Sequence, residues 1–155
     1  MEINSKLLGI IEYASDNIIR FDEGLIGIPE KKNFILIEKE DFKPFSYLQS
    51  VDDPAFVLVV INPMMVEKEY RFDIHKDDLN AIDIMSEDDF SLLAIVIFAK
   101  KIENITVNLK APILINIHTK KALQIILQND DYSVEEPLMR SVSSEPDAAN
   151  IFNTK

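Results

Sequence analysis

Short apolar runs rich in Ile, Val and Phe, separated by clusters of Pro, Asn and Asp, recur along the whole sequence. This pattern is typical of strands rather than helices. Pro44, Pro54, Pro63 and Pro112 lie at the edges of these runs, where a missing amide hydrogen costs least. The sequence therefore predicts an all-β, mainly antiparallel fold, a small β-barrel-like single domain with one or two short helical turns. The predicted strands are residues 7–13, 18–21, 33–38, 45–50, 56–61, 70–74, 82–85, 91–98, 105–108, 113–118 and 122–128.

The residue pattern also predicts which strand faces are buried. Residues 56–61 and 92–98 are almost continuously apolar and β-branched, so we expect them at the centre of the fold with both faces covered. Near the end of the chain, strand alternation places Ile113, Ile115 and Ile117 on the core face.

The length of 155 residues corresponds to one domain with a substantial core. We predict that residues 1–140 form the barrel domain and that residues 141–155, which are mostly polar, form a C-terminal tail. The tail is expected to be mobile or to form a short docked helix. In the helical case Ser144 is the cap, and Ile151 and Phe152 dock against the body or a partner.

Charge and cysteine content narrow the class of protein. Asp and Glu number 27 against 16 Lys and Arg, a formal charge of −11 that repels phosphate backbones and anionic lipids. We therefore expect no direct contact with nucleic acid or membranes. The absence of Cys excludes thiolate chemistry and disulfides and fits a reducing compartment. With no signal-like start and no apolar run of 18 residues, a cytoplasmic location is predicted.

Acidic clusters are the first candidates for catalysis, because two nearby carboxylates can share acid and base roles or hold a cation. The clusters are Asp52-Asp53, Asp77-Asp78 and Glu87-Asp88-Asp89. None has the spacing of a calcium loop, and such clusters in turns are usually solvated caps; the Asp77-Asp78 pair is predicted to cap a short helical turn. The two histidines, His75 and His118, have no local metal-ligand spacing. We predict no catalytic residue, no metal and no cofactor.

Several motifs follow one another in a specific order along the chain. The first are Gly24-Leu25-Ile26-Gly27, then Pro44-Phe45-Ser46-Tyr47-Leu48-Gln49-Ser50 followed by Asp52-Asp53-Pro54, and Asn62-Pro63. Further along are Tyr70 and Phe72, the segment Thr106-Val107-Asn108-Leu109-Lys110-Ala111-Pro112, then Gln124-Ile125-Ile126-Leu127 and Tyr132. This ordered set resembles the FliW flagellar assembly factor family. The resemblance spans about residues 5–140, although Ile26 and Ile28 stand where the family usually has a proline and an aromatic residue.

The resemblance implies a non-enzymatic protein with two partners, flagellin and the RNA-binding translational regulator CsrA. In this family picture the free protein binds CsrA and relieves its repression of flagellin mRNA. Flagellin that accumulates in the cytoplasm before export sequesters the protein, so that CsrA represses again. We expect a monomer when the protein is free of partners.

The proline-bounded segment 44–54 is the first candidate partner surface. It mixes aromatic, amide and acidic residues at a strand-to-turn edge: Phe45, Tyr47, Gln49, Ser50, Asp52 and Asp53. The structural alternative places Phe45 in the core and gives Gln49 and Ser50 the task of satisfying turn amides.

A second candidate surface is the rim formed by Asn62, Met64 and Met65 in an irregular turn. Thioether side chains repack against varied partners and suit an amphipathic helix. Because Met is more often a core residue, the Met pair by itself favours core packing.

Three alternative functions are considered beside the partner switch. An oligonucleotide-binding barrel fits the strand content but not the negative charge. Another acidic protein-binding module has no specific signal, and a carboxylate-based hydrolase needs two acids that converge in a pocket, whereas the sequence offers only adjacent pairs.

Overall fold

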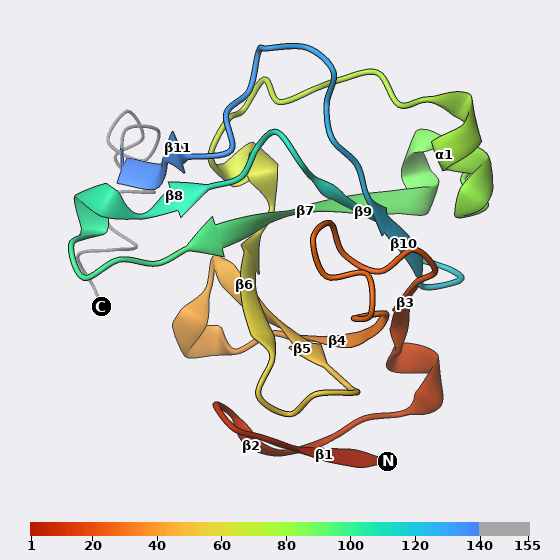
Figure 1. Cartoon of the computed structure of the whole chain (residues 1–155), viewed down its shortest axis with the longest axis vertical. Coiled ribbons are helices and arrows are strands. Elements are labelled where there is room, and N and C mark those ends of the chain that lie inside the picture. Colours follow the sequence, from red (N-terminus) through yellow and green to blue (C-terminus); the bar gives the residue numbers. More distant parts are fainter. Residues whose placement is uncertain (140–155) are drawn as a thin grey trace.

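The computed structural model describes residues 1–139, and the predicted tail at residues 141–155 lies outside the described residues. Its strands are β1 Glu2–Ser5, β2 Gly9–Glu12, β3 Ile19–Phe21, β4 Asn33–Ile37, β5 Phe45–Ser50, β6 Val57–Ile61, β7 Phe90–Ile97, β8 Thr106–Val107, β9 Ile113–Asn116, β10 Lys121–Gln124 and β11 Glu136–Pro137. One α-helix, α1 Lys76–Ala81, accompanies them (Figure 1). Short 3-10 turns lie at Ser15–Asn17, Glu40–Phe42, Pro63–Met65, Glu87–Asp89 and Ile102–Asn104.

Seven strands close into a barrel. The sheet order is β11-β8-β7-β6-β5-β4-β3-β10-β9, and β9 pairs back onto β7, which leaves β8 and β11 as an extension beside the barrel. All described strand pairs are antiparallel except β3 with β10. This all-β, mainly antiparallel barrel with a short helix confirms the predicted fold class.

The barrel wall is covered on both faces over part of its circumference. One core cluster takes buried residues such as Phe34, Leu48 and Val60 from six of the barrel strands, and Leu93 and Ile95 of β7 pack against it; it therefore fills the interior. A second cluster lies on the other face, where Phe45, Ile61 and Leu114 pack with residues from the connections. Adjacent residues on one strand thus enter different cores, because successive side chains of a strand point to opposite faces.

The covering layer is the crossover, residues 62–89, between β6 and β7. Figure 1 shows it running from β6 across the top of the barrel to α1. The predicted strands 70–74 and 82–85 lie here and are wrong, since neither pairs with another strand. Their side chains do alternate between buried and exposed, as in Tyr70, Arg71 and Phe72. An extended segment that packs on a sheet face has this period without any ladder partner.

The predicted faces of the later strands need correction. Ile113 and Ile115 face the interior, but β9 ends at Asn116 and Ile117 is exposed. Asn116 is buried instead, donating from Nδ2 to the Ile82 carbonyl at 2.7 Å, with its Oδ1 accepting the His118 and Thr119 amides. Coverage on both faces of residues 56–61 and 92–98 is partial, because Val57 to Val59 are half-buried and Ile97 is exposed.

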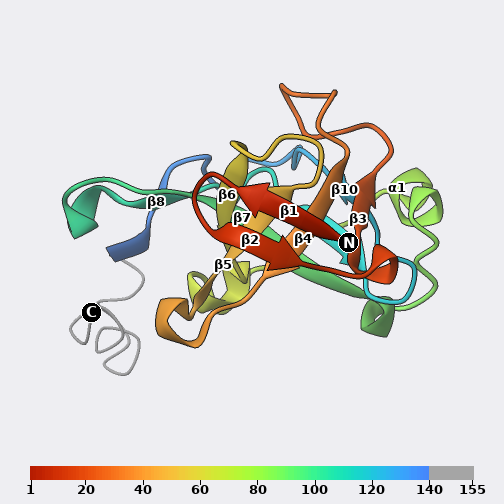
Figure 2. The ribbon, with the colours of Figure 1, turned by 90° about the horizontal axis from the view of Figure 1, so that it is seen from below.

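The sequence pattern predicts only one of the two strands of the N-terminal hairpin. The predicted strand 7–13 is β2, and its partner β1 was not predicted. Viewed from below in Figure 2, the hairpin lies across the end of the barrel. It is attached there by the Lys6 amide, which donates to the Pro54 carbonyl at 2.9 Å.

A turn around Gly24 closes one end of the barrel. Leu25 enters the interior core, and the Ile26 amide donates to Gln124 Oε1 on β10 at 3.0 Å. Gly24 has φ of +68°, and an added Cβ would lie 2.2 Å from the Pro29 carbonyl oxygen. Gly27 also has a positive φ, +85°, but an added Cβ would meet nothing within 4 Å.

This contrast makes a matched pair of variants. Gly27→Ala should lower the free energy of unfolding by about 1 kcal/mol, the strain of a left-handed non-glycine residue. Gly24→Ala should lower it by about 3 kcal/mol or more, because the methyl group also collides with fixed backbone. Urea denaturation of both variants measures the difference. Equal losses would mean that the Pro29 backbone moves away freely.

Candidate functional site

Burial divides the residues of segment 44–54 into two groups. Phe45, Gln49 and Ser50 are fully buried, as the structural alternative expects. Asp52 is exposed, and Asp53 and Tyr47 are partly exposed. Tyr47 stacks on the ring of Phe42 with centroids 4.4 Å apart, and burial raises the pKa of its phenol. Only part of this segment can therefore touch a partner directly.

Gln49 holds the turn between β5 and β6 from inside. Its Nε2 faces four backbone carbonyl oxygens, those of Ser50 at 2.9 Å, Phe56 at 3.3 Å, Asp53 at 3.4 Å and Pro54 at 3.5 Å. Only the amide nitrogen can donate to carbonyls, so the side-chain orientation is determined by this set of acceptors. Its Oε1 is buried and has no hydrogen-bond donor among the described residues.

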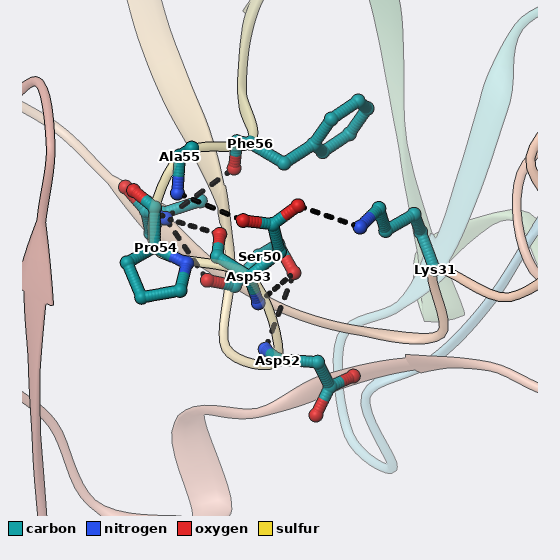
Figure 3. A network of polar contacts seen from close by, with 8 residues as sticks. Lys31, Ser50, Asp52, Asp53, Pro54, Ala55 and Phe56 are labelled. Atoms are coloured by element: carbon teal, nitrogen blue, oxygen red, sulfur yellow. Dashed lines mark hydrogen bonds and ion pairs between the residues drawn. The ribbon is translucent and has the colours of Figure 1, made fainter.

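Ser50 and Asp53 also hold this turn (Figure 3). Ser50 Oγ accepts the amides of Asp52 at 3.2 Å and Asp53 at 3.0 Å. Asp53 accepts the Ala55 amide at 3.0 Å and forms an ion pair with Lys31 at 2.7 Å. The hydrogen bond from Lys31, followed by that from the Ala55 amide, lowers the pKa of the Asp53 carboxyl. We call this arrangement the β5–β6 corner; it presents a rigid backbone edge with Asp52 outermost.

The second predicted surface, Asn62 with the two methionines, is exposed. Asn62 Oδ1 accepts the Met64 amide at 3.0 Å and caps the 3-10 turn that Pro63 begins. Met64 is 49% exposed and Met65 45%, so the prediction that these residues favour core packing is wrong. Pro63 is the buried residue of the turn, and its packing holds the two methionines at the surface.

A groove of about 810 Å³ begins at this rim. Its lining includes apolar side chains of the crossover and of β7, among them Phe72, Leu79 and Phe90. Met64 lies on one side, and Met85, which is 90% exposed, lies in the loop that follows Ile84. We call this feature the methionine groove. Met85 was not among the predicted site residues, although it has the same signal as Met64, a Met beside a turn.

The segment that forms the methionine groove is acidic. The charged residues that line the groove are Asp73, Glu87 and Arg71. Residues 62–92 contain nine acidic and three basic residues, so this fifth of the sequence carries more than half of the net charge of −11. An apolar groove in an acidic segment suits an amphipathic segment with basic flanks.

Asp89 fixes the loop that carries Met85. Its Oδ2 accepts the Met85 and Ser86 amides, both at 2.9 Å, and its Oδ1 lies 3.2 Å from His118 Nε2. The Met85 amide, then the Ser86 amide and His118, lower the pKa of the Asp89 carboxyl. The cluster 87–89 is thus a capping device, in agreement with the expectation for acidic clusters in turns.

The remaining acidic pair also belongs to a helix start. Asp77 and Asp78 lie in the first turn of α1, but the cap is His75, whose Nδ1 accepts the Asp77 amide at 3.2 Å. Within residues 1–139, no three His, Asp or Glu side chains are placed to hold a metal ion together. In the same part of the chain, no helix has the length and apolar character needed to cross a membrane.

Replacing Gln49 tests its role in the β5–β6 corner. Gln49→Met keeps the side-chain volume but removes the donor for buried carbonyls, so the free energy of unfolding should fall by about 1–2 kcal/mol. Gln49→Glu should lower the free energy of unfolding further, because a carboxylate oxygen, which only accepts hydrogen bonds, then faces four carbonyl oxygens. Chemical denaturation measures both variants. The control Gln128→Met, at an exposed position, should stay within about 0.5 kcal/mol of the parent, and an equally small change at Gln49 would contradict the assignment.

The lowered pKa of Asp53 predicts a pH dependence of stability. The ionised carboxylate is favoured in the folded state, so its contribution is present above the ordinary pKa of 3.8 and is lost as pH falls through the lowered folded value. Asp53→Asn should therefore make the loss of stability between about pH 5 and pH 2 shallower. Thermal unfolding across this range measures the slope. The control is Asp130→Asn, because Asp130 is fully exposed and lies 3.7 Å from Lys110; this variant should keep the parent slope. If Asp53→Asn also kept the parent slope, the ion pair with Lys31 would contribute nothing.

Comparison with known proteins places the chain in a family. The sequence model described as "FliW protein" matches residues 2–138. The flagellar assembly factor FliW of Caldanaerobacter subterraneus subsp. tengcongensis is 38% identical over 145 residues, covering 93% of this chain and 97% of the relative. That of Clostridium novyi is 39% identical over 140 residues, covering 90% and 98%.

Structure comparison agrees. A crystal structure of the flagellar assembly factor FliW superposes with a TM-score of 0.84 at 36% sequence identity, covering 89% of this chain and 96% of that chain. The strands and connections that form the barrel, the β5–β6 corner and the methionine groove all lie inside the matched residues. The chain therefore belongs to the FliW family of flagellar assembly factors.

Proposed function

We propose that this chain is a non-enzymatic, cytoplasmic partner switch that binds CsrA and flagellin in turn. In its free, monomeric form it binds CsrA and relieves the repression of flagellin mRNA. Accumulating flagellin sequesters it and restores the repression. The observation that carries the proposal is the family match over residues 2–138, which includes the candidate surfaces described above.

The charge distribution supports an encounter with a basic, RNA-binding partner. A body with a formal charge of −11 attracts such a partner over a range of about 8 Å at physiological salt and speeds association. Once bound, the same charge disfavours RNA beside it. Antagonism of RNA binding then needs no occupation of the RNA site itself.

The methionine groove supports the binding of an amphipathic helix. Met64 and Met85 offer thioether side chains that adapt to varied apolar residues, and the groove between them is apolar. We assign this groove to a helical terminal segment of flagellin. The β5–β6 corner, with Asp52 outermost and Tyr47 and Asp53 partly exposed, is assigned to CsrA. In this assignment Phe45, Gln49 and Ser50 act indirectly, by holding the corner in shape.

The absence of enzymatic activity is part of the proposal. Two features of the acidic clusters support it. The carboxylates of Asp53 and Asp89 are engaged by backbone amides, and Asp77 and Asp78 lie in the first turn of α1. A hydrolase instead needs two carboxyl groups that converge on a substrate.

Titration calorimetry tests the switch. The purified chain is titrated with CsrA, with flagellin, and with each in the presence of the other, at low and moderate salt. We expect binding to both, mutual exclusion, and a weaker affinity for CsrA at higher salt. Failure to bind either partner would refute the proposal, and simultaneous binding of both would refute the switch.

Two charge-introducing variants test the groove. Met64→Asp and Met85→Asp should weaken flagellin binding at least tenfold, a loss of about 1.4 kcal/mol, because each places a charge against the apolar helix face. The control Leu7→Asp changes an apolar residue of the N-terminal hairpin whose exposure, 63%, lies between those of Met64 and Met85. Unchanged flagellin affinity in both variants would refute this assignment of the groove.

A further inference from the structure

The main chain of residues 125–127 continues β10 beyond the end of the strand. The Ile125 amide donates to the Pro112 carbonyl at 3.1 Å, and the Leu127 amide donates to the Lys110 carbonyl at 2.8 Å. Both contacts keep the register of the antiparallel β9–β10 pair. Pro112 has no amide hydrogen with which to complete the ladder. Burial alternates along these residues as in a strand. We call residues 125–127 the β10 extension.

The other edge of the β10 extension is unpaired. Successive amides of an extended strand point to opposite edges, so the Ile126 amide points away from β9. Earlier along β10 this edge is occupied by β3, but that parallel pairing ends at Phe21 with Ala122. Within residues 1–139, no acceptor reaches the Ile126 amide, and the Ile126 carbonyl accepts from the exposed Gln128 side chain at 3.3 Å. Such an edge is a template for an added strand.

An apolar pocket of about 450 Å³ lies beside this free edge. Its lining includes Leu25, Ile26, Ile28, Leu58, Ile95 and Ile126. All of these except Ile26 and Ile126 belong to the interior core or pack against it. Ile26 is 47% exposed and Ile126 is 52% exposed. The pocket therefore has a fixed apolar floor and two accessible aliphatic side chains. We call it the turn pocket, because the turn around Gly24 supplies part of its lining.

The segments that lead to and from the turn pocket are acidic. Residues 22–30 contain three acidic and no basic residues, and residues 122–136 contain four acidic and no basic residues. The charged residue in the lining is Lys110, whose Nζ already donates to the Asn129 carbonyl at 2.6 Å and lies 3.7 Å from Asp130. An apolar site between acidic segments favours an apolar ligand with basic flanks.

We propose that the β10 extension and the turn pocket form a docking site for an extended segment of a partner protein, in which aliphatic residues lie between basic ones. The segment adds a strand beside Ile126, accepts the hydrogen bond of its amide and replaces Gln128 at its carbonyl. An aliphatic side chain of the segment enters the turn pocket beside Ile26. Its Lys or Arg residues lie toward Glu23 and Asp130, which are exposed.

An extended partner fits this site better than a helix or a second copy of the chain. A helix bonds its own backbone groups internally and has no carbonyl to offer to Ile126. A second copy carries the same formal charge of −11 and is repelled. The turn pocket shares no lining residue with the methionine groove and contains no residue of the β5–β6 corner. The proposal therefore goes beyond the partners assigned above.

Hydrogen exchange of the Ile126 amide tests the site with a synthetic peptide, Lys-Lys-Val-Ile-Val-Lys-Lys, with blocked ends. In the ¹⁵N-labelled chain alone, this amide should exchange faster than the bonded amides of Ile125 and Leu127. A millimolar excess of the peptide should slow its exchange about tenfold and shift the amide signal of Ile26, while that of Met85 stays in place. The control peptide Glu-Glu-Val-Ile-Val-Glu-Glu should change none of them.

Two variants at one position separate the backbone of Ile126 from its side chain. Ile126→Pro removes the amide donor, so it should weaken binding of the lysine peptide about tenfold. The matched control Ile126→Val keeps the donor and a β-branched side chain and should bind within about twofold of the parent. Should Ile126→Pro fail to fold, an N-methylated form of the lysine peptide, which lacks strand donors, should bind the parent about tenfold more weakly.

Each contrary outcome overturns the proposal. Unchanged exchange at Ile126 with the lysine peptide means that no strand is added there. Slow exchange in the free protein means that the edge is already covered, by a second copy if the exchange depends on protein concentration. Equal effects of the two peptides mean that basic flanks do not select the partner. Binding that is insensitive to Ile126→Pro and to N-methylation means that the backbone edge is not used. None of these measurements involves CsrA or flagellin, so the outcome is independent of the proposed partner switch.

Discussion

One strand, β7, pairs with three neighbours, and the rest of the structure depends on this pairing. Its middle pairs with β6, its first half with β9 and its last two residues with β8. Because β8 and β9 pair with different parts of β7, the chain must move away from β7 after β8 and return to it as β9. Asn108 makes this departure: its amide donates to the Ile95 carbonyl, and its Oδ1 accepts the Lys110 and Ala111 amides. Pro112 then holds Ala111 extended at the start of β9. The motif Asn108-Leu109-Lys110-Ala111-Pro112 closes the barrel.

The crossover and the closing motif stabilise one another. Tyr70, from the crossover, donates its hydroxyl to the Leu109 carbonyl at 2.6 Å, and burial raises the pKa of this phenol. The ring also contacts Tyr132 at 4.6 Å, so the segment before β11 joins the same cluster. A groove built on this layer has a floor that is packed from both sides. Its shape is therefore set by the fold, and its adaptability comes from the methionine side chains at its rim.

Sequence pattern predicted the elements whose signal is local. The runs that became β3 to β7 and β9 to β10 carry β-branched residues between turn residues, and this composition alone indicates strands. Strands β1 and β11 were missed because they are short and are defined by a partner far along the chain or by a single hairpin. The crossover was misassigned because burial against a sheet face produces the same alternation as a strand.

Local capping roles, such as those of Ser50 and Asn108, could be inferred from residue type. The methionine groove could not, since only the tertiary fold brings Met64 and Met85 to the same groove.

The parallel pairing of β3 with β10 has a consequence for folding. It joins Arg20 with Lys121 and Phe21 with Ala122, residues about 100 positions apart. Contacts of this separation slow folding, because a long loop must close before they form. At a ribosomal rate of about 5–20 residues per second, β3 waits on the order of 5–20 s for its neighbour. Until then the sheet edge at β3 is unpaired, and the interior is open to solvent. Such a chain acquires its binding surfaces late and all at once, after nearly the whole polypeptide has been translated.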